Sequence, residues 1–336
     1  MITSHCAIPC CRRLAKHFSG TARRCRRVLL SLLLSLYPFI AYSDSPTIWL
    51  LQSGEAPVYE QVTASILSSL DSICTECAAY QIKQLNLDDT PSDALSASGD
   101  SKPTLIVSIG VKAARFVASS QTPVPKLYTL IPYSSAASLN LDESSKNASA
   151  IYLDQPYIRQ LKLIKLIKTE KQVLGVLFGP ATSALRAMLK MAANNLKIPI
   201  ATESVTEEAE VGQALRRILE SSDILLALPD PLVYNRDTIF NILLSSYHSQ
   251  IPVIGFSASY VNAGAMLAVF STPSDIGIHI AETIRQFIIS DGKGLPEAEF
   301  PRYFSVEVNR SVARSLDIDL PDSEELKQRL EQMEGQ

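Results

Sequence analysis

From Thr47 onward, short runs rich in Ile, Val and Leu alternate with longer segments in which apolar residues recur at helical spacing. This alternation is typical of parallel sheets, because their strands are buried by the helices that connect them. The first set of predicted strands covers residues 47–53, 79–85, 104–110 and 126–131. A second set follows the polar segment 139–149, with predicted strands at 150–154, 172–178, 198–204, 223–229 and 251–256. The sequence therefore predicts the α/β class, with two Rossmann-like lobes that each contain a parallel sheet.

The helices expected in the second set are 157–168, 182–195, 207–221 and 235–248. The segment 264–288 predicts a strand, a break at Pro273 and a helix capped by Ser274 with Asp275 in its first turn. A short strand is expected at 302–309, and the charged residues beyond Asp317 favour a loose helix. Because this extra helix and strand follow two similar units, we expect the chain to return to the first lobe. The expected boundaries are 46–153 plus 272–299 for the N-terminal lobe, 154–271 plus 300–310 for the C-terminal lobe, and 311–336 for a charged C-terminal tail.

The first 43 residues have the layout of a secretory signal peptide. They contain seven basic side chains and no acidic one, and the apolar run Val28–Tyr42 follows the basic part. Ala41 and Ser43 are small residues at the positions that signal peptidase requires before Asp44. The apolar run is short for a membrane span, although an uncleaved anchor is the alternative. This segment predicts export to the periplasm.

Removal of that segment leaves 24 basic side chains against 34 acidic ones, a net charge of about minus ten. Nucleic-acid phosphates would repel such a chain, so nucleic acid is not an expected partner. The remaining cysteines, Cys74 and Cys77, follow an amphipathic helical segment, and in an oxidising compartment they predict a disulfide. A redox-active pair is the alternative, but it would favour a first cysteine at a helix start.

In open parallel sheets, ligands bind beyond the carboxyl ends of the strands. The predicted strands end in small polar, glycine and aromatic residues, which suit a pocket for a small solute. The predicted ligand-binding residues are Ser53, Ser108, Gly110, Tyr133, Thr182, Asp230, Tyr234, Phe256, Ser257 and Tyr260. For each of these residues, the alternative is a structural role in a turn or in packing. Asp230 would either bind a ligand ammonium group or cap the following helix near Val233 or Tyr234.

Catalytic signals are weak. The run GFSAS at 255–259 departs from the nucleophile elbow at Ser259, and the histidines beyond the signal segment, His248 and His279, have no metal-ligand spacing. The sequence predicts no enzyme, no metal site and no cofactor.

A family resemblance rests on five runs of residues. Two of them are LPDPLVYNRDT (228–238) and IPVIGFSASYVNAGAMLAVFSTPSDIG (251–277), and the runs IVSIGVKAA, YLDQPYIRQLKLIKLI and VLGVLFGPATS precede them in the expected order. Over most of residues 46–310 the chain resembles the ABC-transporter substrate-binding proteins, whose members include tryptophan and tyrosine binders. The resemblance implies the type I periplasmic-binding fold, with crossings between the lobes near residues 153, 271 and 300 and a ligand held between the lobes.

By position, the resemblance places Ser108 and Gly110 at one end of the ligand and matches Asp230 to an acidic residue of the family. The chain departs from the aromatic amino-acid binders at Pro132 and Tyr133, and at Ser257 and Ala258, where those proteins tend to have further acids. These departures favour a less cationic or more aromatic solute than an amino acid.

The leading hypothesis is a periplasmic solute-binding component of an ABC-type uptake system. It would close on a small aromatic or amino-acid-like ligand by hinge motion and deliver it to a membrane permease. The alternative is a ligand-sensing subunit of the same fold that signals to a membrane receptor or kinase, and neighbouring genes would separate the two. A secreted hydrolase that uses Ser257 is a third hypothesis, for which no base is identifiable.

Overall fold

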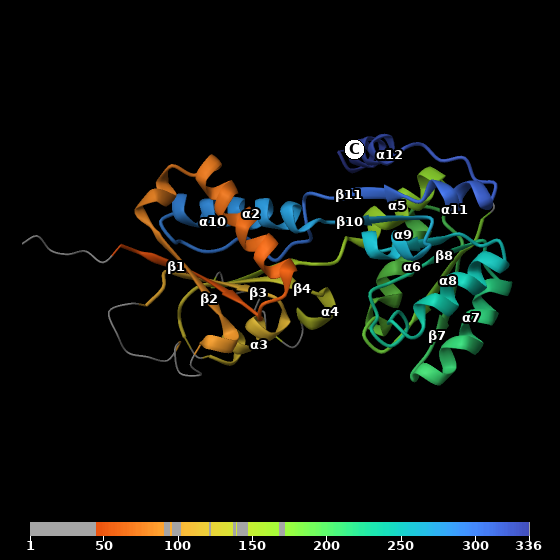
Figure 1. Ribbon diagram of the computed structural model, residues 1–336, viewed down its shortest axis with the longest axis horizontal. Coiled ribbons are helices and arrows are strands. Elements are labelled where there is room, and N and C mark those ends of the chain that lie inside the picture. Colours follow the sequence, from red (N-terminus) through yellow and green to blue (C-terminus); the bar gives the residue numbers. More distant parts are fainter. Residues whose placement is uncertain are drawn as a thin grey trace, which may run out of the picture. The chain divides into compact units, whose positions relative to one another are not determined.

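The computed structural model describes residues 45–90, 95, 102–120, 122–136, 139, 147–167 and 172–335 (Figure 1). The predicted signal peptide lies outside these residues, so both the peptide and its alternative stay predictions. In the part of the chain that the structure describes, no helix combines the length and apolar character needed to cross a membrane.

The first sheet has five parallel strands in the order β2-β1-β3-β4-β5. Its strands are β1 (Thr47–Gln52), β2 (Gln81–Asn86), β3 (Leu105–Ile109), β4 (Lys126–Ile131) and β5 (Ala148–Tyr152). Its connecting helices are α2 (Pro57–Ile73), α3 (Val111–Ser119) and the short α4 (Tyr133–Ala136). Although β5 opens the second set in the sequence, it pairs with β4 and completes the first sheet.

The second sheet has six strands in the order β11-β10-β9-β8-β6-β7, and only β11 is antiparallel to its neighbour. The strands are β6 (Leu174–Phe178), β7 (Ile200–Ser204), β8 (Ile224–Leu226), β9 (Val253–Gly255), β10 (Leu267–Phe270) and β11 (Ser305–Val308). The helices are α5 (Tyr157–Ile167), α6 (Arg186–Asn195), α7 (Val211–Glu220), α8 (Ile239–His248) and α9 (Ala258–Ala263). The predicted α/β class with two sheets is confirmed.

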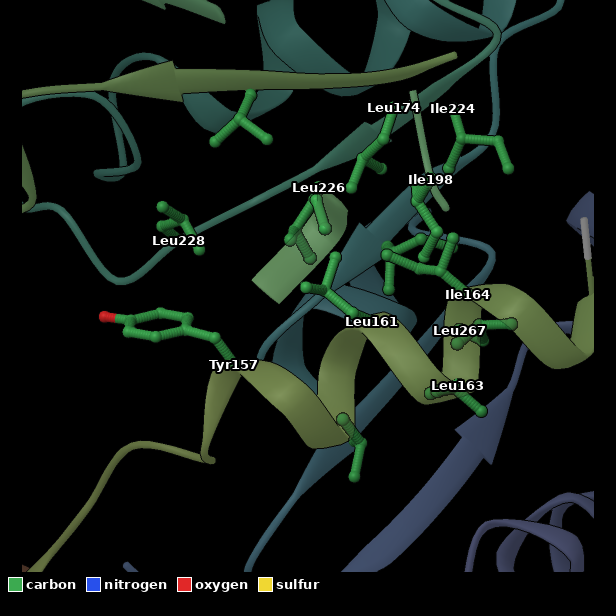
Figure 2. Close-up of a cluster of buried hydrophobic side chains, with 14 of the residues drawn as sticks. Tyr157, Leu161, Leu163, Ile164, Leu174, Ile198, Ile224, Leu226, Leu228 and Leu267 are labelled. Atoms are coloured by element: carbon green, nitrogen blue, oxygen red, sulfur yellow. The ribbon is translucent and has the colours of Figure 1, made fainter. Parts of the chain in front are cut away.

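One of the two buried clusters of the second sheet forms between α5 and the strands it covers, and a second one forms between the strands and helices α7 and α8. Leu161 and Ile164 on one face of α5 meet strand residues such as Leu174 and Leu226, and all four are at most 1% exposed (Figure 2). The helical spacing of the α5 residues and the continuous apolar character of the strands account for this packing.

Helix α10 (Pro273–Ile289) begins differently from the prediction. Thr272, not Ser274, is the N-cap: its hydroxyl accepts a hydrogen bond from Asp275 N at 3.1 Å, and the Asp275 carboxylate accepts one from Thr272 N at 2.8 Å. Pro273 therefore opens the helix at its first position, where its missing N–H costs nothing, and does not break it. The predicted cap at Ser274 is wrong.

The helix α10 packs against α2, so it belongs to the core of the first sheet (Figure 1). The chain thus passes between the sheets three times, at residues 153–156, 271–272 and 300–304, which we call the crossings. Whether the two sheets and their helices move as separate lobes with the predicted boundaries stays a prediction.

Close contact between α10 and α2 depends on Gly277. A Cβ atom added there would lie 2.4 Å from Ser65 Cβ and 3.0 Å from the Val62 carbonyl oxygen. We expect Gly277→Ala to lower the free energy of unfolding by about 1–3 kcal/mol, because the helices must separate. Urea denaturation measures this change.

Gly212 in α7 provides the matched control, because a Cβ atom there would meet nothing within 4 Å. Gly212→Ala should raise the free energy of unfolding by about 0.4–1 kcal/mol, since alanine restricts the unfolded chain. Effects of the same sign for both variants would contradict the packing of α10 on α2.

The C-terminal segment differs from the loose helix expected there. It contains α11 (Arg310–Ser315) and α12 (Ser323–Glu334), and α12 packs on α5 (Figure 1). Leu326 and Leu330 are 0% exposed within the core of the second sheet. The charged tail is therefore an integral part of the fold.

Candidate ligand-binding site

Two of the predicted residues on the first sheet lie against each other. Ser53, just after β1, is buried, and its hydroxyl accepts a hydrogen bond from Ala113 N at 2.9 Å. Gly110 is the N-cap of α3 with φ 95°, and a Cβ atom there would lie 2.6 Å from Ser53 Oγ and 2.8 Å from Tyr59 Cε1. Only glycine fits this conformation and this close approach. Ser53 and Gly110 therefore shape the start of α3 at the carboxyl edge of the sheet.

Ser108 and Tyr133 occupy different surroundings. Ser108 lies within β3 and is 0% exposed, and its hydroxyl has no hydrogen-bond partner among the described residues. The ring of Tyr133 packs against Tyr152 and Phe300, with centroids 5.0 Å and 5.4 Å apart, and its backbone N–H donates to the Asp154 carboxylate. Tyr133 thus belongs to an aromatic cluster beside the first and third crossings.

Thr182 and Asp230 form a buried pair on the second sheet. The Asp230 carboxylate accepts hydrogen bonds from Thr182 N at 3.0 Å, Thr182 Oγ1 at 2.9 Å and Leu232 N at 3.0 Å. Asp230 is 1% exposed, and a Cβ atom at Gly179 would lie 2.3 Å from its Oδ1. This carboxylate joins the loops after β6 and β8. Neither of the capping partners expected for it, Val233 or Tyr234, is among these donors.

The remaining predicted residues gather after β8 and β9. The Phe256 and Tyr260 rings lie 4.3 Å apart between centroids, and the Tyr260 hydroxyl donates to the Tyr234 carbonyl at 3.1 Å. Ser257 is the N-cap of α9, and its hydroxyl accepts from Tyr260 N. Phe256, Ser257 and Tyr260 are partly exposed, whereas Tyr234 is buried and its hydroxyl has no partner within the described part of the chain.

Burial controls the ionisation of these phenols. It raises the pKa of Tyr260 to about 12, and it raises the pKa of Tyr234 further, with smaller contributions from the nearby Tyr260 and Asp230. Both phenols are therefore neutral at physiological pH. The partly exposed Tyr260 presents an aromatic surface, whereas Tyr234 is buried.

One residue that shapes these edges was not predicted from the sequence: Tyr59, which covers Gly110. Gly179 gives Asp230 the room to reach Thr182, and as a glycine directly after a predicted strand it is among the strand-end positions that the sequence indicates. Tyr59 carried no comparable signal, because it reaches Gly110 only through tertiary packing.

Two of the side chains considered for catalysis or metal binding, His279 and Ser257, are engaged in structural contacts. His279 is buried, and its Nε2 lies 2.9 Å from Glu299 Oε1, while the Ser257 hydroxyl caps α9. Across the residues that the structure describes, no group of three or more His, Cys, Asp or Glu side chains could hold a metal ion. Cys74, which caps α2, forms a disulfide with Cys77.

The fold is that of an α/β protein in which the predicted ligand-binding residues are distributed over two sheets. Residues 66–329 match the family described as ABC transporter substrate binding protein. Because this match covers more than half of the chain, the protein belongs to that family. The corresponding search of curated proteins gives no match.

Solved structures with the same fold include three bacterial proteins. A conserved domain protein from Vibrio cholerae is 21% identical, with 85% of this chain and 98% of that chain covered and a TM-score of 0.57. An ABC domain from Streptococcus pneumoniae, solved with L-Trp, is 18% identical over 85% and 98% of the two chains, with a TM-score of 0.58. A ligand-free, open substrate-binding protein with adhesive properties from Clostridium difficile is 20% identical over 83% and 97%, with a TM-score of 0.67. The expected type I periplasmic-binding fold and the family resemblance are confirmed.

Proposed function

We propose that the protein is the exported solute-binding component of an ABC-type uptake system, which closes on a small ligand and presents it to a membrane permease. The observation that carries the proposal is the position of the predicted ligand-binding residues: nearly all lie at the carboxyl ends of parallel strands in two sheets joined by three crossings. In parallel α/β sheets, this edge is where ligands bind. The protein would bind its ligand without changing it covalently and would work in the periplasm.

We further propose that the ligand is a small aromatic solute. Phe256 and Tyr260 offer partly exposed rings that a flat ligand can contact, and the Streptococcus pneumoniae relative was solved with L-Trp. The Asp230 carboxylate is buried and already accepts three hydrogen bonds from its own chain. An ammonium group on the ligand would therefore find little free acceptor capacity there, which favours aromatic acids and related solutes over cationic ones.

A thermal-shift screen of the purified protein tests this proposal. The panel contains L-tryptophan, L-tyrosine, aromatic carboxylic acids, nucleosides, sugars and short peptides. A ligand that binds only the folded state stabilises it by about 2.7 kcal/mol at a concentration one hundred times its Kd, so the melting temperature should rise. We expect the aromatic acids to give the shift.

Two phenylalanine variants identify where the ligand binds. Phe256→Ala should abolish the ligand-induced shift, because it removes a ring at the proposed site. Phe240→Ala, on α8 with its side chain 69% exposed, should retain the shift. A panel without any stabilising compound, or a full shift in Phe256→Ala, would contradict the proposal. If the purified protein binds a ligand but cells that lack the protein still take up that ligand at the wild-type rate, the result would favour the sensing alternative.

A further inference from the structure

Side-chain hydrogen bonds connect the three crossings to one another. Gln155 in the first crossing donates from Nε2 to Ser271 Oγ in the second at 2.8 Å. Ser271 Oγ in turn donates to the Tyr303 carbonyl oxygen in the third crossing at 2.6 Å. These bonds fix each crossing to the next, so a change in the path of one crossing is transmitted to the other two.

The guanidinium of Arg159, in the first turn of α5, adds a second connection. Its NH1 donates to Gln155 Oε1 and to the Pro301 carbonyl oxygen, both at 2.8 Å. The guanidinium also lies 4.2 Å from the centroid of the Phe304 ring. Arg159 is 6% exposed, so its planar donor group is held in one orientation between the first and third crossings.

The end of α12 holds this guanidinium in place. Glu334 accepts hydrogen bonds from Arg159 Nε at 2.7 Å and from NH2 at 2.9 Å, in the two-pronged geometry that gives arginine–carboxylate pairs their specificity. Helix α12 is itself fixed to α5 through the buried side chains of Leu326 and Leu330, and Lys162 donates to the Met333 carbonyl. The orientation of Arg159 at the crossings therefore depends on the last helix of the chain.

We propose that α12 is a hinge clamp, in which Glu334 is a positioning residue that sets the arrangement of the crossings through Arg159. This inference rests on the proposed function, since a hinge serves a protein that closes on a ligand. Loss of the Glu334 carboxylate leaves the buried guanidinium without its counter-ion, so the bonds from Arg159 to Gln155 and Pro301 lose their orientation. The crossings then open more often, while the cores of the two sheets stay intact.

Amide hydrogen exchange of the full-length, ligand-free protein tests the clamp. In Glu334→Ala, we expect exchange in peptides covering residues 153–156 and 299–304 to become about tenfold faster, and exchange in β6 and β8 to stay at the wild-type rate. Spin labels at Lys112→Cys on α3 and Glu220→Cys on α7, both exposed, should also report a broader distance distribution between the sheets.

Glu331→Ala is the matched control, because it removes a carboxylate from the same helix at an exposed position whose Lys327 partner lies 4.0 Å away. It should leave exchange at the crossings within about twofold of wild type. If Glu334→Ala fails to fold, Glu334→Gln retains one acceptor for Arg159 and should give a smaller increase in exchange at the same peptides.

The clamp is overturned if the Glu334 variant that folds shows wild-type exchange at the crossings, or if exchange rises equally in β6 and β8. The second result would mean that Glu334 only stabilises the fold. Because these measurements need no ligand, they stand apart from the ligand screen. If no ligand stabilises the protein in the screen but Glu334→Ala still speeds exchange only at the crossings, the proposed function is rejected and the clamp is not.

Discussion

Phe178→Ala is expected to lower the free energy of unfolding by about 3–5 kcal/mol. Phe178 ends β6 and is 0% exposed within the core of the second sheet. Its ring also lies 5.0 Å from the Arg186 guanidinium. Alanine would remove the buried ring and leave a cavity that the close-packed surroundings fill only in part.

The same substitution should also weaken the candidate site. Phe178 directly precedes Gly179, against which the Asp230 carboxylate packs so closely that a Cβ atom there would lie 2.3 Å from Asp230 Oδ1. Any collapse of the loop into the cavity would disturb the hydrogen bonds between Thr182 and Asp230. We therefore expect the ligand-induced thermal shift to fall under conditions in which the variant is still folded.

Chemical denaturation with guanidinium chloride measures the loss of stability, and an unchanged m-value would show that the denatured state is the same. The matched control is Phe240→Ala, which removes the same ring from an exposed position and should change the free energy of unfolding by no more than about 0.5 kcal/mol. Equal losses in the two variants would show that Phe178 does not occupy the core position described above.

The buried strands could be predicted because their apolar runs are short and bounded by polar residues. The predicted strand at 126–131 coincides with β4, and the other strands differ mainly at their ends. Helix starts were less accurate, because the 3-10 turns Ser183–Leu185 and Glu208–Glu210 precede α6 and α7. The start of α10 shows why. Both Thr272 and Ser274 can cap a helix, but Pro273 favours the first helical position, which makes Thr272 the N-cap.

The contacts of the candidate site could not be read from the chain, because they join residues distant in sequence. A carboxylate between two prolines allowed a ligand contact or a helix cap, but no local pattern indicated that Asp230 pairs with Thr182, 48 residues earlier. Arg159 and Glu334 are separated by 175 residues, and no local pattern connects them. Helix α12 is mostly polar or charged, and its two buried leucines, Leu326 and Leu330, are too few to predict a buried face. That face becomes evident only from the packing of α12 on α5.

Leu330→Ala should lower the free energy of unfolding by about 2–5 kcal/mol, because the Leu330 side chain is 0% exposed in the core of the second sheet. Thermal or urea denaturation measures the change. Gln332→Ala is the control on the same helix, at an exposed position, and should alter stability by no more than about 0.5 kcal/mol. A loss for Leu330→Ala as small as that of the control would restore the interpretation of the residues beyond Asp317 as a loose helix.

Leu330→Ala also separates the packing of α12 from its proposed effect on the crossings. The substitution leaves Glu334 and Arg159 in the chain but weakens the attachment of the helix that brings them together. If α12 detaches locally before the protein unfolds, hydrogen exchange should increase first in α12 and at the crossings, and later in β6 and β8. If exchange instead increases in all these segments together, α12 unfolds only with the whole second sheet, and its packing belongs to the global stability of the fold.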